Sequence, residues 1–388
     1  MNIKIHRAKW VLVSQEKVME NGCVTVANGR ITAIGRGGGT HLEGEVLDHG
    51  AGVIMPATIN AHTHLELSLL KGRIPGKEDF LSWVKAIIHL KDCLTNKDIH
   101  QGLLSGANEL YKYGAVLAGD HRSVSMQFPD TYWPVIIRFR EYLRLEPAEI
   151  LCDLNKDKYL SLAAHAPHTT APELIKRMKD ETKRHGRIFS VHLAESPEEA
   201  EFITTAKGKW AGLLNERGVK FSSWGLPAKS PVSYLDDMGV LDDKTLAVHL
   251  VQAGPGDLDL IAERGACVCL CPRSNNRLIE ELPDIPAMLK RGIRPALGTD
   301  SLASVETLSL FDEMAFISES FPSLNSGDII SMATVNGAKA LGMGEELGTL
   351  EPGKRAALLY LPVYTSSASM LIRSLAAGSF KGLPEVIR

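Results

Sequence analysis

The chain has 388 residues, of which 44% are hydrophobic and 23% charged, and its formal net charge is −3. This length suits one large α/β domain with a smaller companion, and the near-neutral charge argues against nucleic acid or an anionic membrane as the main partner. No apolar run approaches the roughly eighteen residues of a membrane-spanning helix, and the alternating N-terminus predicts a strand rather than a signal peptide.

The two ends of the chain have the texture of a β-sheet. Short alternating segments at 3–14, 23–35 and 45–50 are separated by Asn-Gly and glycine-rich turns. The stretch LGTLEPGKRAALLYLP (347–362) returns to the same pattern near the C-terminus. We therefore expect residues 1–52 and 346–388 to form one small β-sandwich-like domain.

Between these ends, short apolar runs alternate with amphipathic stretches, which is typical of βα units and a parallel sheet. One predicted helix runs from Thr95 as N-cap to Gly114, and another opens at Thr170 and ends at Gly186. The predicted strands lie at 53–59, 115–119, 135–139, 161–165, 188–193, 245–250, 267–271 and 294–298. Eight such units over residues 53–345 predict a (β/α)₈ TIM-type barrel. An open doubly wound sheet is the alternative, but no G-x-G-x-x-G follows an early strand.

The six cysteines of so long a chain predict no disulfide framework, and a reducing cytoplasm is the expected compartment. Cys267, Cys269 and Cys271 alternate along one predicted strand and lack C-x-x-C spacing. We expect them to be small packing side chains rather than metal ligands.

Metal-competent side chains gather at the ends of the predicted strands. They are His62, His64, His165, His192, His249 and Asp300. In a TIM-type barrel the carboxyl ends of the strands form one face, where catalytic groups lie. One histidine alone is more often structural, but six such side chains at the ends of five strands are hard to produce by chance. Imidazoles with a carboxylate predict one divalent metal ion, with zinc first and iron(II) or manganese as alternatives.

The ordered motifs PATINAHTHLEL, HAPHT, VHLAES, CPRSN, LGTDS, ATVNGAKALGM and LGTLEPGK extend over nearly the whole chain. In this set the sequence resembles the amidohydrolase superfamily, in the branch of cytosine, guanine, adenosine and aminodeoxyfutalosine deaminases. The resemblance implies that four residues bind a single metal ion: His62, His64, His192 and Asp300. The fourth strand ends without the lysine that bridges two metals in binuclear relatives, which implies a mononuclear site.

The resemblance also implies roles around the metal. Glu195 would be the proton shuttle to a substrate ring nitrogen, while His249 and Asp300 would orient the attacking water and accept its proton. His165 matches a histidine that contacts the substrate in the deaminases. His168 stands where the family usually has tyrosine, and Arg273 is a charge within C-P-x-S-N.

The implied activity is hydrolytic release of ammonia from an aminated nitrogen heterocycle, a small-molecule substrate. Arg138, Arg140 and Arg273 follow strand ends, and arginine favours carboxylates and phosphates. We expect Arg138 and Arg273 to bind the substrate, while the direction of Arg140 stays open. If they face inward, an adenine nucleoside with an anionic extension fits better than a bare base, with aminodeoxyfutalosine, adenosine and S-adenosylhomocysteine as candidates. Phe80 and Trp83 would pack against such a substrate, although at helical spacing they also suit a core.

Other activities stay open from the sequence. A metal-dependent hydrolase of a cyclic amide, or of another leaving group on a heteroaromatic ring, would use the same residues. A third interpretation is a non-enzymatic binding protein with the same barrel. The complete set of metal ligands argues against it. A cytidine-deaminase-type zinc site is excluded because no P-C-x-x-C is present. The oligomeric state stays open, including a homo-oligomer.

Overall fold

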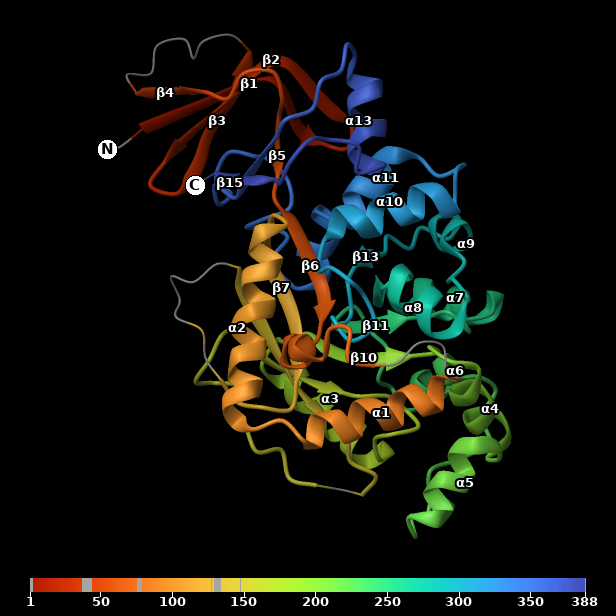
Figure 1. The fold of residues 1–388 in the computed structure, drawn as a ribbon. Coiled ribbons are helices and arrows are strands. Elements are labelled where there is room, and N and C mark those ends of the chain that lie inside the picture. The colour runs from red at the N-terminus through yellow and green to blue at the C-terminus, as the bar shows by residue number, and fades with distance from the viewer. Residues whose placement is uncertain are drawn as a thin grey trace.

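Apolar–polar alternation at the start of the chain produces the small sheet seen at one end of the molecule, beside both termini (Figure 1). The computed structural model describes residues 3–36, 44–74, 79–126, 128, 134–146 and 148–387. The strands of this sheet are β1 (Ile3–Ser14), β2 (Lys17–Ala27), β3 (Arg30–Arg36), β4 (Glu45–Asp48), β5 (Val53–Pro56), β14 (Leu358–Leu361) and β15 (Glu385–Ile387). Asn28 and Gly29 join β2 to β3 with φ of 52° and 72°, as a tight hairpin turn requires. The seven strands form one hydrogen-bonded sheet in the order β15-β14-β5-β1-β2-β3, with β4 on β1.

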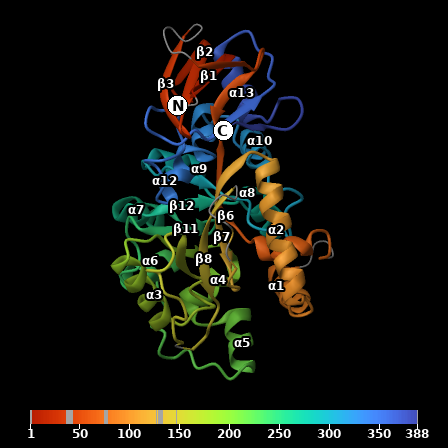
Figure 2. The same ribbon diagram turned by 90° about the vertical axis from the view of Figure 1, so that its left-hand side faces the viewer.

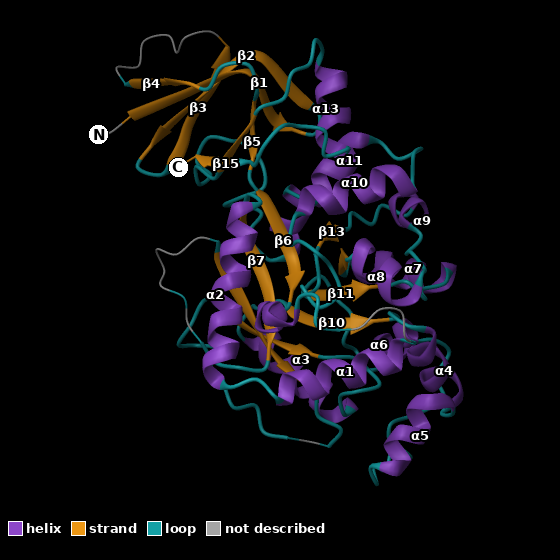
Figure 3. Ribbon diagram, viewed as in Figure 1, coloured by secondary structure: helices purple, strands orange, loops and turns teal. Residues whose placement is uncertain are grey.

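Eight parallel strands form the second sheet, in the order β13-β12-β11-β10-β9-β8-β7-β6. They are β6 (Thr58–Thr63), β7 (Ala115–Arg122), β8 (Val135–Tyr142), β9 (Leu160–Ala164), β10 (Phe189–Leu193), β11 (Thr245–His249), β12 (Cys267–Leu270) and β13 (Ala296–Leu297). The first and last strands meet where Thr63 bridges to Asp300 and the backbone N–H of Thr299 donates to the carbonyl of His62 at 3.0 Å. The predicted TIM-type barrel is confirmed, with helices around the strands (Figure 3).

The helices follow the strands along the chain. They are α1 (Phe80–Asp92), α2 (Asn96–Lys112), α3 (Pro172–Arg184), α4 (Pro197–Thr205), α5 (Gly208–Glu216), α6 (Pro231–Asp237), α7 (Pro255–Arg264), α8 (Pro272–Ile279), α9 (Ile285–Lys290), α10 (Leu310–Ser320), α11 (Ser326–Met332), α12 (Val335–Ala340) and α13 (Ala368–Ala376), with a 3₁₀ turn at Leu65–Leu70. Within the described ranges, no helix has the length and apolar character needed to cross a membrane. Cys269 and Cys271 are buried among the barrel strands and all six cysteines are free thiols.

Two boundaries differ from the expectation. The segment Val53–Pro56, which we expected to open the barrel, pairs with β1 and β14 in the small sheet, and the first barrel strand starts at Thr58. The apolar run 53–59 is buried both in β5 of the small sheet and in β6 of the barrel. Its composition therefore does not show where the small sheet ends and the barrel begins. The C-terminal segment is also not purely β, because α13 packs on α10 and α11 beside the barrel, with Leu371 and Leu375 in the main core.

The start of α2 shows the predicted capping chemistry. The Thr95 hydroxyl accepts from the Asp98 N–H at 3.2 Å, and the Asp98 carboxylate accepts from the Thr95 N–H at 2.9 Å. We expect Thr95→Ala to lower the free energy of unfolding by about 1 kcal/mol, because the Asp98 N–H at the helix end loses its hydroxyl acceptor. Urea denaturation measures the change, with the exposed Lys97→Ala as control. Equal stability of the two variants would contradict the cap's contribution.

Candidate metal centre and active site

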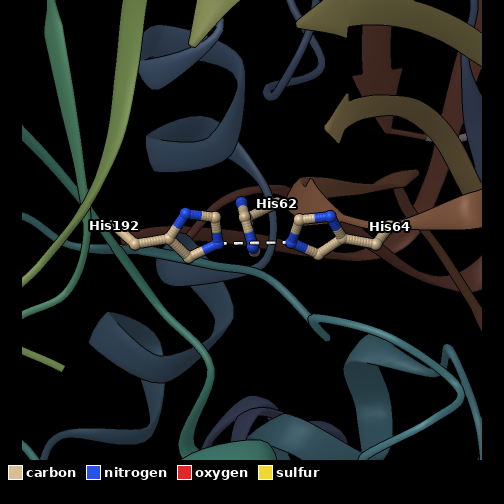
Figure 4. A group of neighbouring side chains, drawn as sticks. All are labelled: His62, His64 and His192. Carbon is tan, nitrogen blue, oxygen red and sulfur yellow. Dashed lines mark hydrogen bonds between the residues drawn. The ribbon is translucent and has the colours of Figure 1, made fainter. Parts of the chain in front are cut away.

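Three histidines meet inside the barrel mouth. His62 lies on β6, His64 follows directly, and His192 comes from β10. One nitrogen from each lies within 4.8 Å of the others. The Nε2 atoms of His64 and His192 point at each other, 3.2 Å apart, with His62 between the two rings (Figure 4). The strand ends that sequence spacing singled out are therefore adjacent in space.

Asp300 approaches the same point from the residues that follow β13. Its Oδ1 lies 3.6 Å from the His64 Nε2 and 3.9 Å from the His62 Nε2. Its Oδ2 accepts hydrogen bonds from the hydroxyls of Ser274, at 2.6 Å, and Ser304, at 3.1 Å. The two serines thus hold the carboxylate so that its other oxygen faces the histidines.

These four residues fit one divalent metal ion. Burial lowers the pKa of His64 to about 4 and those of His62 and His192 well below their usual value, so all three imidazoles are neutral, the form that binds metals. Neither ring nitrogen of the fully buried His62 has a hydrogen-bond partner in the described part of the chain. Two ligand atoms at about 2.0–2.1 Å from one ion lie roughly 3.3 Å apart. The Nε2 atoms of His64 and His192 are 3.2 Å apart, and the Asp300 Oδ1 lies 3.6 Å and 3.9 Å from the Nε2 atoms of His64 and His62.

Backbone carbonyls fix the direction of two of the rings. The Nδ1 of His64 lies 3.0 Å from the carbonyl oxygen of His121, and the Nδ1 of His192 lies 2.7 Å from that of His165. With the Nδ1–H donated to a carbonyl, each Nε2 is left free as a ligand atom. Sequence reasoning missed both contacts, because a carbonyl acceptor carries no side-chain signature.

Glu195 lies beside this centre. The loop after β10 is held by Glu199, whose carboxylate accepts from the N–H of Ala194 at 2.9 Å and of Glu195 at 2.8 Å. The Glu195 Oε1 then lies 3.5 Å from the His249 Nε2. Burial, with a smaller contribution from Asp300, raises the pKa of Glu195 to about 8. A carboxyl that keeps its proton near neutral pH suits a general acid.

His249 ends β11 in an unusual backbone conformation, with φ of 80°, and Asp300 has φ of 58°. Such left-handed conformations cost energy in non-glycine residues and concentrate at functional sites. The amide of Asn275, in the CPRSN motif, donates to the His249 Nδ1 at 3.0 Å. The ring proton therefore lies on Nε2, which faces Glu195. The sequence did not reveal Asn275 as the partner that fixes this tautomer.

A cavity of about 200 Å³ is lined by these residues and by residues of α1 and α5. Both helices lie toward the end of the molecule opposite the small sheet (Figures 1 and 2). Phe80 and Trp83 of α1 line the cavity, and so does Trp210 of α5. His165 and His168 also lie in its wall, and the His168 ring packs on Trp210 with centroids 4.6 Å apart. The outer part of the cavity is thus mainly apolar.

The arginines predicted at the substrate site lie elsewhere. Along β8 the side chains alternate, so Phe139 and Glu141 face the barrel interior while Arg138 and Arg140 face outward. Arg138 forms an ion pair with Asp157 and its Nη1 donates to the Met126 carbonyl at 3.2 Å. The prediction that Arg138 binds the substrate was wrong, because the two faces of β8 are exchanged relative to the expectation. Arg140, whose direction was left open, also faces outward.

Arg273 is also directed away from the cavity. Its guanidinium lies between three carboxylates, at 3.2 Å from Glu306, 3.7 Å from Asp312 and 3.5 Å from Glu313. Arg273 therefore links the start of α8 to α10 and to Glu306, in the segment before α10. The prediction of Arg273 as a substrate-binding residue was wrong as well.

Comparison with known proteins places this chain in a family. The 5-methylthioadenosine/S-adenosylhomocysteine deaminase of Syntrophobacter fumaroxidans is 28% identical over 374 residues, covering 87% of this chain and 79% of that protein. The aminodeoxyfutalosine deaminase of Deinococcus radiodurans is 28% identical over 334 residues, covering 76% and 75%. The Helicobacter pylori aminofutalosine deaminase, solved in complex with methylthio-coformycin, has the same fold, with a TM-score of 0.81, 24% identity and 96% coverage of each chain. The model of the Amidohydrolase family matches residues 53–373, most of the sequence, and the chain belongs to that family.

Proposed function

We propose that the protein is a metal-dependent hydrolytic deaminase that releases ammonia from adenine nucleosides. The observation that carries this proposal is the group formed by the three buried histidines and Asp300, with Glu195 beside it at 3.5 Å from His249. A proton donor next to a metal centre, at the base of a cavity, is the arrangement that hydrolytic deamination requires. The names of the curated relatives support an adenine nucleoside as the substrate.

The ligands in this proposal are His62, His64, His192 and Asp300, and the ion is zinc. Three imidazoles and one carboxylate are ligands that zinc prefers, and the same set also suits iron(II) and manganese. When bound, the ion supplies a water acidic enough to act as nucleophile near neutral pH. Metal analysis of protein purified without chelator identifies the ion.

The chain's own residues move the protons. Asp300, with Oδ2 held by two serine hydroxyls, presents Oδ1 to accept the proton that the attacking water loses. Glu195 gives its proton to the ring nitrogen next to the carbon that carries the amine, which makes that carbon electrophilic. His249, with its proton on Nε2, holds the attacking oxygen by a hydrogen bond. The proton taken up by Asp300 then leaves with the amine. The proton left on the added hydroxyl returns to Glu195 as the C=O bond forms, so that one water and one substrate yield ammonia and the oxo product.

The cavity favours a nucleoside with an apolar extension over a bare base. The wall beyond the histidines includes Phe80, Trp83, Ile87, Trp210 and Leu214. The side chains of Arg138, Arg140 and Arg273 do not line it. The three arginines named from the sequence therefore do not bind an anionic extension of the substrate, while Lys85, Lys91 and Arg217 line the cavity. An apolar group buried against such a wall improves kcat/KM by about 10- to 200-fold.

We expect 5′-methylthioadenosine to be deaminated at least tenfold more efficiently than cytosine or guanine. The measurement is kcat/KM for ammonia release over a panel that also contains adenosine, S-adenosylhomocysteine and aminodeoxyfutalosine. Preference for a bare base would contradict the nucleoside assignment. Turnover of cyclic amides without ammonia release from any aminated ring would support the other hydrolase reaction instead.

A further inference from the structure

Glu141 is an acidic residue in the wall of the active-site cavity, and none of the steps proposed above uses it. It lies near the end of β8, its side chain is 11% exposed, and it lines the cavity together with His64 and His192. Its Oε1 has no hydrogen-bond partner among the residues that the structure describes. An acceptor enclosed in this way, facing a ligand cavity, is expected to have a partner when the ligand is bound.

The metal centre does not use Glu141. Its oxygens lie 4.0 Å from the Nδ1 of His64 and 3.6 Å from the Nδ1 of His192, too far for hydrogen bonds. Both Nδ1 atoms already have carbonyl partners, at 3.0 Å and 2.7 Å. Asp300 approaches the opposite edge of the His64 ring, at Nε2. Glu141 therefore lies on the side of the ligand rings away from Asp300.

The neighbouring charges also leave Glu141 free. Lys91 of α1 forms an ion pair with Glu66. The Glu66 carboxylate also accepts a hydrogen bond from the backbone N–H of Ser123, at 3.1 Å. Glu66 is thus engaged within the protein, whereas Glu141 offers an unused acceptor on the same side of the cavity.

We propose that Glu141 determines specificity by accepting a hydrogen bond from a sugar hydroxyl of the substrate. This rests on the proposed deamination of adenine nucleosides. Such a nucleoside carries two kinds of hydrogen-bond donor, the reacting amine and the sugar hydroxyls, and a carboxylate accepts from either. The amine must lie beside Glu195 and Asp300, so the hydroxyls are the donors that remain for Glu141. A site built around a substrate hydroxyl rejects analogues that lack it.

The test crosses enzyme variants with substrate analogues. Wild type, Glu141→Ala and Glu141→Gln are assayed with adenosine, 2′-deoxyadenosine and 3′-deoxyadenosine, and metal content is measured for each protein. For wild type we expect loss of one hydroxyl to lower kcat/KM by about 10- to 100-fold. In Glu141→Ala the same loss changes kcat/KM less than threefold, adenosine itself is processed about 10- to 100-fold less efficiently through a higher KM, and metal content stays at the wild-type level. Glu141→Gln keeps the side-chain shape and shows the same effect to a smaller degree.

Arg140→Gln is the matched control, since Arg140 is the neighbouring residue on β8 and faces outward. It should retain the wild-type preference for the hydroxyl. The proposal is overturned if Glu141→Ala slows all three nucleosides by one common factor, keeps the wild-type hydroxyl preference, or loses its metal. If wild type releases ammonia from none of them, the proposed deamination itself fails, an outcome distinct from any effect confined to the Glu141 variants.

Discussion

Replacing His192 with alanine is expected to remove both the bound metal and the activity. The His192 Nε2 lies 3.2 Å from that of His64, and the variant leaves only two imidazoles and Asp300 to hold the ion. The backbone of β10 should change little, because the ring contacts the backbone through the hydrogen bond between its Nδ1 and the His165 carbonyl. Metal analysis after purification without chelator, together with ammonia release from the best nucleoside, measures the effect. We expect less than a tenth of the wild-type metal content and no measurable turnover.

His100→Ala is the control for this experiment. His100 is an exposed histidine on α2, outside the barrel, so its loss removes an imidazole without touching the cavity. Its metal content and rate should equal those of wild type. A His192→Ala protein that keeps a full metal complement would show that the ion is held elsewhere, and the assignment of the ligands would have to be abandoned.

The sequence predicted well which side chains lie at the carboxyl ends of the barrel strands. The fold of a parallel barrel puts all carboxyl ends of the strands on one face, so placing a histidine at a strand end also places it near the others. This is why six side chains separated by up to 238 positions could be grouped from the sequence: His62, His64, His165, His192, His249 and Asp300. The choice of His62, His64, His192 and Asp300 as the ligands among them came from the family resemblance. The grouping needed only strand limits, which tolerate an error of one or two residues.

Side-chain direction within a strand was harder to predict. A shift of one position in the alternation exchanges the two faces of a strand. On β8 this exchange put Arg138 and Arg140 outside and brought Glu141 into the cavity, reversing the expectation. The pairing of Phe139 with the buried ring of His121, at 4.5 Å between centroids, fixes that phase, and no feature of the segment by itself reveals it.

Contacts between distant parts of the chain were out of reach for a different reason. The hydroxyl of Ser274 and the amide of Asn275 stand next to Arg273 in one motif, and the resemblance drew attention to the charged residue. In the structure the two uncharged side chains orient Asp300 and His249, while Arg273 pairs with acidic residues of the following segments. Which of three adjacent polar residues points inward depends on the start of α8, at Pro272, and on its packing.

Glu195→Gln is expected to lose most of the turnover while keeping fold and metal. The amide occupies the same space as the carboxyl but has no acidic proton to deliver to the substrate ring, and a general acid of this kind typically contributes ~10²–10⁴-fold in rate. The loss should appear in kcat, because protonation of the ring develops in the transition state rather than on binding. Glu199, which holds the Glu195 backbone, is unchanged in the variant, so the loop should keep its position.

Glu201→Gln provides the comparison, because Glu201 is an exposed glutamate of the same acidic stretch, on α4. It should retain the wild-type rate, which shows that the loss in Glu195→Gln does not come from removing a negative charge in this region. Steady-state ammonia release and metal analysis of both variants decide the question. A loss below tenfold with the metal retained would mean that another group protonates the ring. A large loss accompanied by loss of metal would instead place Glu195 among the groups that hold the ion.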